Sequence, residues 1–255
     1  MCFHISTYKE PEYWEKNFRV KISDPNLKPV FSKPNYHLNG FSHPNMLIIP
    51  QEKSDVLAPG VWGIVPSNKT KNEIKDYYKE AVKYGSGLNA QSEKVFQHFI
   101  YRDSIMTKRC VIPINGFYEP HEHNKKKYPF YITVKNEHPF ALAGIYSVID
   151  SIATFTILTK AASPLFAKVH NTKKRQVIMM DEEQSHNWLS NDLNTDDIKD
   201  LIQSDYPAPK LEAYSVRKDL FKRNVNSNVD TITDRVDYPE LSVLYKDIAE
   251  LTQAS

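Results

Sequence analysis

The hydrophobic and polar positions divide the chain into a proline-rich first part and a strand-rich middle. Prolines recur from Pro25 to Pro66, which excludes long helices there and favours short strands and turns. Apolar residues at helical spacing predict helices around residues 72–83 and 92–106. Apolar, β-branched and aromatic runs then predict strands at residues 110–118, 129–134, 140–148 and 154–159.

The rest of the chain alternates short helices and strands. Ser163 and Pro164 predict an N-cap followed by the first residue of a short helix, which ends near His170. Further elements are expected at residues 177–180 (strand), 182–189 and 195–204 (helices), 211–216 (strand) and 241–251 (helix). We therefore predict an α+β fold in which a mixed, mainly antiparallel, barrel-like sheet is flanked by helices. A single domain is expected over residues 1–230, with residues 231–255 as a helical extension packed on it.

Composition and charge narrow the classes of function. The 33 basic and 31 acidic residues leave a net charge of +2, so any nucleic-acid site must be a local basic patch. The chain has no apolar run of signal-peptide or membrane-spanning length, and we expect a cytoplasmic monomer. In such a compartment Cys2 and Cys110 are expected to be free thiols. Cys110 lies in an apolar run and is expected in the core, whereas Cys2 is expected to be accessible.

Cys2 becomes a distinctive reactive group if Met1 is removed. An N-terminal cysteine carries an amine and a thiol on neighbouring carbons, and both are partly nucleophilic at neutral pH. The amine can form a Schiff base with an aldehyde, and the thiol can then close a thiazolidine ring. The alternative is that cysteine at this position is incidental.

Three polar residues stand in apolar surroundings, where burial is costly without partners or a function. They are Asn89, Glu119 and His170. Each has an ordinary alternative: Asn89 as a helix cap, Glu119 as a solvated carboxylate at a strand end, and His170 as a partner of a helix C-terminus.

Several segments together resemble the SOS response associated peptidase (SRAP) family, which processes abasic sites in single-stranded DNA. Each segment alone is a modest signal, but their order and spacing are specific. Beside Met1-Cys2, the resemblance depends on Trp62-Gly63-Ile64-Val65-Pro66, Asn89-Ala90-Gln91-Ser92-Glu93, residues 109–119 (RCVIPINGFYE), residues 155–159 (FTILT) and residues 170–180.

The resemblance implies a role for each polar residue. Cys2 would attack the ring-opened aldehyde of the abasic site and form a thiazolidine DNA–protein crosslink, after autoproteolytic release of whatever precedes it. Glu119 would act as the acid and base, Asn89 would hold the Cys2 backbone or the sugar, and His170 would hydrogen-bond or protonate the opened sugar. Single-stranded DNA containing abasic sites is therefore the expected partner.

The chain also departs from the family pattern. Gln91 stands where the family has an arginine, and Phe3-His4 replaces a common Gly-Arg pair, so we expect His4 to substitute in part for the lost charge. DNA binding would then depend on local basic runs, although each could equally be a solvated face. The residues expected to contact DNA are Trp62, Gln91, Lys125, Lys126, Lys127, Thr159, Lys173, Lys174 and Arg175, with Lys108-Arg109 as a further basic pair. Trp62 and Phe117 are either base-stacking surfaces or core residues.

Three other functions compete with this one. His121-Glu122-His123 could hold zinc, but no further ligand pattern accompanies it and the lysines after it would repel a cation, so we expect no metal and no cofactor. A cysteine peptidase that acts on other proteins through Cys2 and His170 would not need a free amine at Cys2. In a non-enzymatic single-strand-binding module, Cys2 would be irrelevant.

Overall fold

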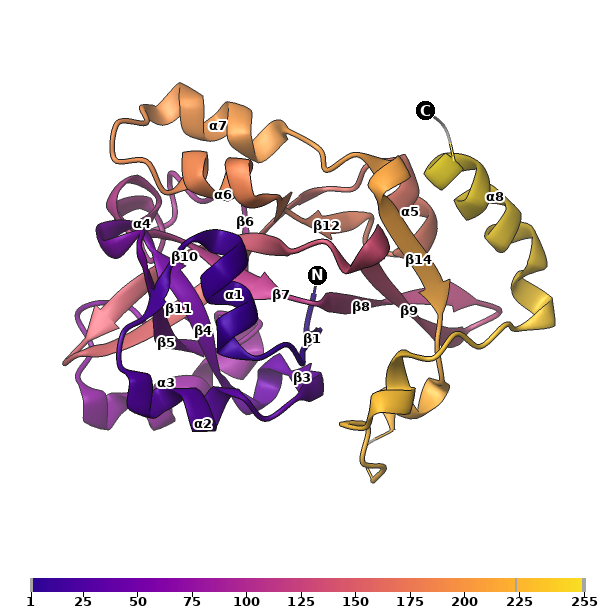
Figure 1. The fold of residues 1–255 in the computed structure, drawn as a ribbon, viewed down its shortest axis with the longest axis horizontal. Helices are drawn as coiled ribbons and strands as arrows, with labels where there is room; N and C mark the ends of the chain where they lie inside the picture. Colours follow the sequence, from indigo (N-terminus) through magenta and orange to yellow (C-terminus); the bar gives the residue numbers. More distant parts are fainter. Residues whose placement is uncertain (1, 223, 254–255) are drawn as a thin grey trace.

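A computed structural model describes residues 2–222 and 224–253, and its strands form two sheets with a shared interior (Figure 1). The first sheet has the strand order β14-β9-β8-β1-β3, and all its neighbours are antiparallel. A tight turn joins β8 to β9, with positive φ angles at Asn124 and Lys125. The five strands are β1 (His4–Thr7), β3 (Asn35–Asn39), β8 (Gly116–His123), β9 (Lys126–Val134) and β14 (Leu211–Ser215).

The second sheet closes into a barrel. Its strands β11, β10, β7, β4 and β5 follow one another, and a parallel pairing of β11 with β5 completes the ring. The mixed, mainly antiparallel, barrel-like sheet predicted from the sequence is thus confirmed. The barrel strands are β4 (Asn45–Pro50), β5 (Val56–Trp62), β7 (Arg109–Ile114), β10 (Phe140–Ile149) and β11 (Ile152–Ala161). Shorter strands extend it: β2 (Lys21–Ile22), β6 (Asn89–Gln91), β12 (Arg175–Val177) and β13 (Met179–Met180).

The single strand predicted over residues 110–118 is wrong, because the chain changes sheets at Asn115. The Asn115 side chain accepts hydrogen bonds from the backbone N–H groups of Tyr8 and Lys9, at 2.7 and 3.2 Å. Gly116 follows where a side chain would collide with the ring of Tyr131. Strand β7 therefore ends in the barrel, and β8 begins in the five-stranded sheet beside β1.

Eight α-helices lie outside the sheets in the described part of the chain. In Figure 1, α6 and α7 cover one side of the barrel, and α2 and α3 lie on the opposite side. Proline is the first residue of both α1 and α5, and reciprocal side-chain caps start α6 and α7. The helices are α1 (Pro11–Phe18), α2 (Lys28–Phe31), α3 (Ile74–Ala81), α4 (Arg102–Thr107), α5 (Pro164–Val169), α6 (Glu182–Trp188), α7 (Thr195–Gln203) and α8 (Ser242–Gln253).

The helix predicted over residues 92–106 is too long. Only α4 is α-helical there, and the chain before it forms turns. Strand β6 ties this segment to the barrel, and the Ser92 N–H then donates to the Thr159 carbonyl oxygen at 2.9 Å. Val95 and Ile105 still reach the core, so their spacing reports burial but not a continuous helix.

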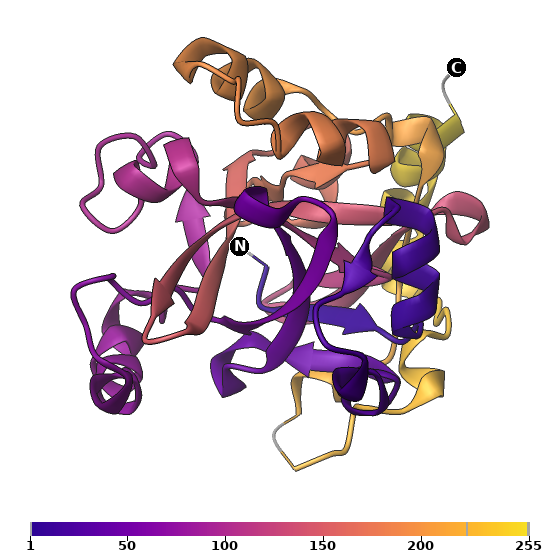
Figure 2. The same ribbon diagram turned by 60° about the vertical axis from the view of Figure 1, so that its left-hand side comes forward.

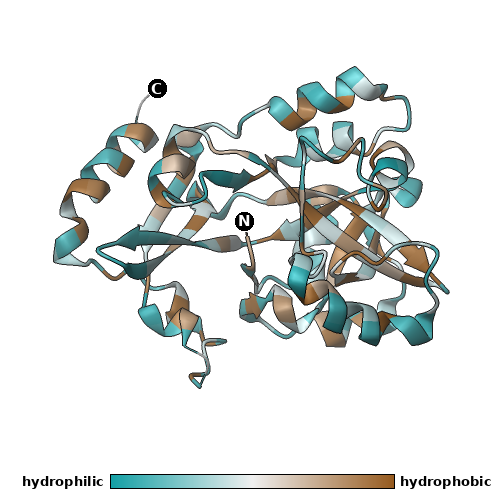
Figure 3. Cartoon of the chain, turned by 180° about the vertical axis from the view of Figure 1, so that it is seen from behind, coloured by the Kyte–Doolittle hydropathy of each residue, from teal (hydrophilic) through white to brown (hydrophobic). Residues whose placement is uncertain are grey.

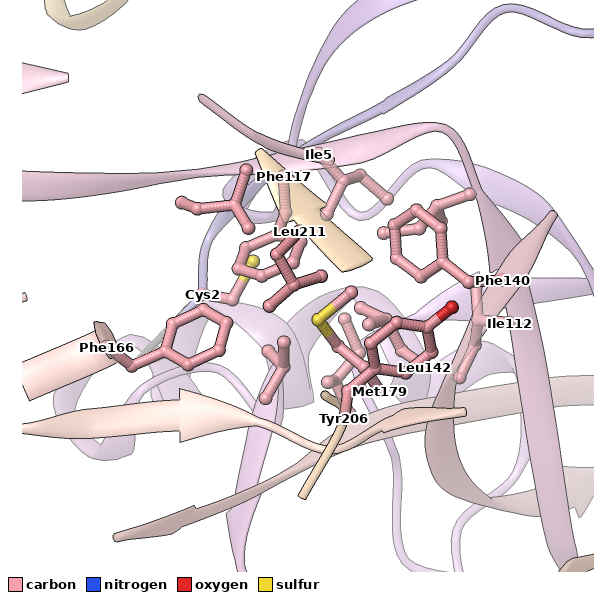
Figure 4. Close-up of a cluster of buried hydrophobic side chains, with 14 of the residues drawn as sticks. Cys2, Ile5, Ile112, Phe117, Phe140, Leu142, Phe166, Met179, Tyr206 and Leu211 are labelled. Atoms are coloured by element: carbon pink, nitrogen blue, oxygen red, sulfur yellow. The ribbon is translucent and has the colours of Figure 1, made fainter. Parts of the chain in front are cut away.

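The core fills the barrel and the space between the two sheets. Figure 4 shows one part of it, where Phe117 of β8 and Phe166 of α5 lie near Leu142 and Met179 of the barrel side. Figure 3 shows hydrophobic residues concentrated on the barrel strands, while the tip of the β8–β9 hairpin is hydrophilic. Glu119 and His170 are among the polar side chains that this interior buries.

The C-terminal helix α8 packs on α5 and β14. Lys168 of α5 and Asp247 of α8 form an ion pair of 2.6 Å, and Leu244 and Ile248 join the shared core. The predicted domain boundary at residue 230 stays a prediction, and residues 254–255 of the predicted extension lie outside the described residues. Within residues 2–222 and 224–253, no helix combines the length and apolarity needed to cross a membrane.

Candidate functional site

Cys2 lies two residues before β1, and the chain that leads into β1 lies near the middle of the molecule (Figure 2). Its side chain is fully buried in the shared core (Figure 4), so the predicted accessible thiol is wrong for this structure. Burial, and then the charge of Glu119, raises the pKa of the Cys2 thiol well above its usual range, which keeps the thiol neutral. The predicted removal of Met1 concerns a residue outside the described part of the chain.

Asn89 holds the backbone of Cys2. Its Nδ2 donates to the Cys2 carbonyl oxygen at 2.8 Å. Asn89 begins β6, which pairs in parallel with β11, so the alternative of a helix cap is wrong. Glycine is required at position 87, just before this strand. Its φ of 66° is a conformation that other residues rarely adopt, and a Cβ atom there would collide with the Ile64 carbonyl oxygen. The Asn89 Oδ1 atom is buried and has no hydrogen-bond partner among the described residues.

Glu119 and His170 form a buried pair. Glu119 Oε2 lies 3.3 Å from His170 Nδ1, and the two side chains are 1% and 4% exposed. His170 follows the last residue of α5, while Glu119 lies on β8, the strand that pairs with β1. Two elements far apart in sequence thus place these groups together beside the start of the chain.

At neutral pH the pair is a contact between a carboxyl group and a neutral imidazole, and not an ion pair. Burial raises the pKa of Glu119 to about 7 and lowers the pKa of His170 to about 4. His170 Nδ1 also lies 3.3 Å from the Arg175 carbonyl oxygen. Because a carbonyl oxygen can only accept, the contacts assign the proton to Nδ1 and leave Nε2 as an acceptor. Near neutral pH, Glu119 can therefore give or take a proton while His170 stays neutral.

These contacts connect the four residues that we predicted to be catalytic. Asn89 bonds to Cys2, Glu119 acts electrostatically on the Cys2 thiol, and His170 contacts Glu119. The arrangement combines a thiol, a carboxyl group that titrates near neutral pH and a neutral imidazole. Such a set can move protons during addition to a carbonyl group.

The two lysine runs lie on exposed turns. Lys125, Lys126 and Lys127 are exposed at the tip of the β8–β9 hairpin, and Lys173 and Lys174 are exposed between α5 and β12. In contrast, the pair Lys108-Arg109 is not a free basic patch: Lys108 pairs with Glu52 at 2.9 Å. Arg109 is fully buried and donates to four backbone carbonyl oxygens, those of Ile105, Met106, Trp188 and Ser190.

Arg175 and Thr159 are engaged inside the protein. The Arg175 guanidinium pairs with both carboxylate oxygens of Glu93, at 2.8 and 2.9 Å, and donates to the Thr159 carbonyl oxygen at 2.7 Å. Thr159 is fully buried. In this conformation Arg175 ties β12 to β11 and to the turn after β6, while Gln91 beside it is half-buried.

Trp62 and Phe117 are core residues, the second of the two roles predicted for them. Both are fully buried, and Trp62 Nε1 donates to the Leu88 carbonyl oxygen at 2.9 Å. His4 does not replace the missing arginine charge, which corrects our expectation. Burial lowers the pKa of His4 to about 3, and its Nδ1 lies 2.8 Å from His37 Nε2.

His121, Glu122 and His123 do not converge as metal ligands. No cluster of three or more histidine, cysteine, aspartate or glutamate residues with metal-binding geometry occurs in residues 2–222 and 224–253. His121 instead faces the end of α5, and Asn171 bonds to the backbone of Glu122. No local pattern in the sequence indicates these contacts, although the two histidines stand out in it.

Comparisons with known proteins agree with the fold and identify the family. The family model described as SOS response associated peptidase (SRAP) matches residues 1–223, so the chain belongs to the SRAP family. It is 30% identical over 227 residues to the abasic site processing protein YoqW of Bacillus subtilis (85% of this chain, 92% of that protein). It is 32% identical over 228 residues to the abasic site processing protein YobE of the same organism (85% and 94%). A crystal structure of a Bacteroides thetaiotaomicron protein matches with a TM-score of 0.80 and 27% identity, covering 92% of this chain and 100% of that one.

Proposed function

We propose that this protein processes abasic sites in single-stranded DNA by forming a covalent crosslink through Cys2. The observation that carries the proposal is the buried Glu119 carboxyl group, with a pKa of about 7, which contacts His170 and acts electrostatically on the Cys2 thiol. Relatives named abasic site processing proteins support the choice of substrate.

The proposed reaction needs an amine and a thiol on the same residue. The Cys2 amine adds to the aldehyde of the ring-opened sugar, and loss of water gives a Schiff base. The thiol sulfur then bonds to the former aldehyde carbon while its proton passes to the nitrogen. The product is a thiazolidine, and the balance is one aldehyde and one aminothiol converted to one ring and one water.

Each neighbouring group has a role in these steps. Glu119 takes a proton from the amine and returns one to the departing hydroxyl group, which suits a carboxyl group that titrates near neutral pH. Asn89 fixes the Cys2 carbonyl group and thereby the direction of the amine and thiol. His170 presents Nε2 to a hydroxyl group of the opened sugar.

The amine becomes available when the peptide bond between Met1 and Cys2 is hydrolysed. We propose that the protein carries out this cleavage itself, which consumes one water and makes the site a cysteine autopeptidase before it becomes a crosslinking centre. The single-stranded DNA would be held by Gln91 and by the exposed lysines of the two turns, Lys125, Lys126, Lys127, Lys173 and Lys174.

The cleavage of the Met1–Cys2 bond proposed above happens once and within the chain, whereas repeated cleavage of other proteins needs an activated thiol, and the electrostatics argue against that activity. That chemistry uses a thiolate stabilised by a protonated histidine. Here burial raises the pKa of the Cys2 thiol and lowers the pKa of His170, so both groups stay neutral at pH 7.

The test is a denaturing gel of purified protein incubated with single-stranded DNA that contains one abasic site. We expect a heat-stable adduct with the wild type, none with Cys2→Ala, and none when the N-terminal amine is chemically capped. Cys110→Ala is the matched control, because Cys110 is equally buried in the core and should leave the adduct unchanged.

Three results would contradict the proposal. If the wild type binds this DNA but forms no adduct, the protein is a non-enzymatic single-strand-binding module. An adduct that survives Cys2→Ala would move the chemistry to another residue. A capped protein that still reacts would exclude the role of the amine and favour a thiol-only mechanism.

A further inference from the structure

Strand β8 continues past Glu119 with His121, Glu122 and His123, which take no part in the proposed chemistry. His121 lies two residues after Glu119 on β8, so the two side chains point to the same face of the sheet. Its side chain is buried, and its ring packs edge-on against Phe130 with centroids 5.8 Å apart. This buried histidine needs polar partners.

The partners of His121 are at the end of the helix that precedes His170. Its Nδ1 lies 3.0 Å from the Lys168 carbonyl oxygen and 3.2 Å from the Val169 carbonyl oxygen. Both oxygens can only accept, so Nδ1–H is the donor. The last carbonyl groups of a helix lack helical partners, and His121 satisfies two of them in α5.

A second contact holds the chain just after His170. The Glu122 backbone N–H donates to Asn171 Oδ1 at 3.0 Å, and Asn171 Nδ2 donates to the Glu122 carbonyl oxygen at 2.8 Å. Strand β8 therefore fixes the chain on both sides of His170. Helix α5 spans only Pro164–Val169, too short to keep its direction without such contacts.

We propose that His121 and Asn171 are positioning residues that hold the His170 imidazole against Glu119. One strand then carries the proposed acid and base and also sets the place of its histidine partner. The inference rests on the proposed function of Glu119 and His170, but the geometry that it concerns can be measured without DNA.

The experiment compares three variants of the full chain. His121→Phe keeps a ring against Phe130 and removes the donor, whereas His121→Asn places an amide N–H near the position of Nδ1. His123→Phe is the matched control, because His123 lies on the same face of the hairpin and its side chain contacts Asn124 and Tyr128. Two quantities are measured: the titration of the His170 side chain by NMR, assigned with His170→Gln, and the single-turnover crosslinking rate at saturating DNA.

For His121→Phe we expect the crosslinking rate to fall about tenfold to a hundredfold, with the dissociation constant for DNA unchanged, because the reacting groups are misplaced but no DNA contact is lost. The pKa of His170 should rise from about 4 toward its ordinary value of 6.5 as the ring gains solvent. The charged groups near that ring, which are the N-terminal amine, Lys173 and Glu119, are the same in all variants. His121→Asn should recover most of the wild-type crosslinking rate and bring the pKa of His170 back toward its wild-type value. His123→Phe should match the wild type in both.

The proposal is overturned if folded His121→Phe titrates and reacts like the wild type, or if His121→Asn is no better than His121→Phe. If His121→Phe does not fold, Asn171→Ala removes the other half of the clamp and is judged by the same two quantities. A wild type that forms no crosslink would refute the proposed function, while the His170 titration would still decide whether His121 positions that ring.

Discussion

The buried carboxyl group of Glu119 should make the folded protein less stable as the pH rises through neutrality. In the unfolded chain this group ionises near 4.5, whereas in the folded protein burial raises its pKa to about 7. Between these two values the unfolded chain has lost the proton and the folded protein has kept it. Stability therefore falls as the pH rises from 4.5 to 7, and the full penalty is present above 7.

Glu119→Gln removes this penalty, because the amide has the shape of the protonated carboxyl group and carries no charge. A pKa difference of this size corresponds to about 3 kcal/mol at pH 8 and to less than about 1 kcal/mol at pH 5. Glu119 is 1% exposed, so solvent screening does not reduce the effect. We expect Glu119→Gln to exceed the wild-type melting temperature by roughly 5–10 °C at pH 8 and by much less at pH 5.

The assay is thermal and urea unfolding of both proteins at pH 5 and pH 8. At each pH we take the difference in free energy of unfolding between Glu119→Gln and the wild type. Subtracting the difference at pH 5 from the difference at pH 8 cancels the contributions of all other titrating groups. The variant should also lose crosslinking activity, as expected where a strained group serves function. Equal pH dependence in the two proteins would show that the Glu119 carboxyl group has an ordinary pKa and would remove it as the proposed acid and base.

Three further predictions concern DNA binding and the core. Gln91→Arg should bind abasic single-stranded DNA more tightly, with a plot of log K against log salt steeper by about 0.7, and an unchanged slope would place this side chain away from the phosphates. Replacing Lys125, Lys126 and Lys127 together by alanine should flatten the same plot, measured by fluorescence anisotropy, and no change would make the hairpin tip a solvated surface. Trp62→Ala should lower the free energy of unfolding by about 3–5 kcal/mol, because it removes a buried ring; a smaller loss together with weaker DNA binding would instead make Trp62 a DNA contact.

The sequence predicted the class of fold and much of the site because the informative residues are local. Alternating and β-branched runs identified β9, β10 and β11 within a few residues, and Ser163-Pro164 located the start of α5. Asn89, Glu119 and His170 were conspicuous as polar residues in apolar surroundings. Glu119 and His170 are buried in contact with each other, and Asn89 bonds to the Cys2 backbone, which is the physical reason for that pattern.

Other features depend on tertiary contacts that no local pattern reports. The break at Asn115 is caused by hydrogen bonds to Tyr8 and Lys9, more than a hundred residues away. The apolar spacing of residues 92–106 reflects burial against the barrel and resembles a helix only by coincidence. Charge was misread for the same reason, because Arg109 and His4 are cationic types that the fold buries among carbonyl oxygens or beside another histidine.

Cys2 has one property that the sequence predicts and one that depends on tertiary contacts. Its chemistry followed from its place in the sequence, but its burial could not, because the packing of Phe117 and Phe166 around it comes from β8 and α5. The Asn89 Oδ1 atom, which has no hydrogen-bond partner among the described residues, is a suitable acceptor for a hydroxyl group of the sugar in the proposed reaction.

Mass spectrometry of the crosslinked protein, after digestion with nuclease and trypsin, shows whether Cys2 carries the thiazolidine. Trypsin cleaves after Lys9, so we expect a modified peptide that begins at Cys2, ends at Lys9 and lacks Met1. Its mass should equal the peptide plus the sugar remnant minus one water, with neither a free amine nor a free thiol at Cys2. A modification on a lysine or on Cys110, or a modified peptide that retains Met1, would contradict the account.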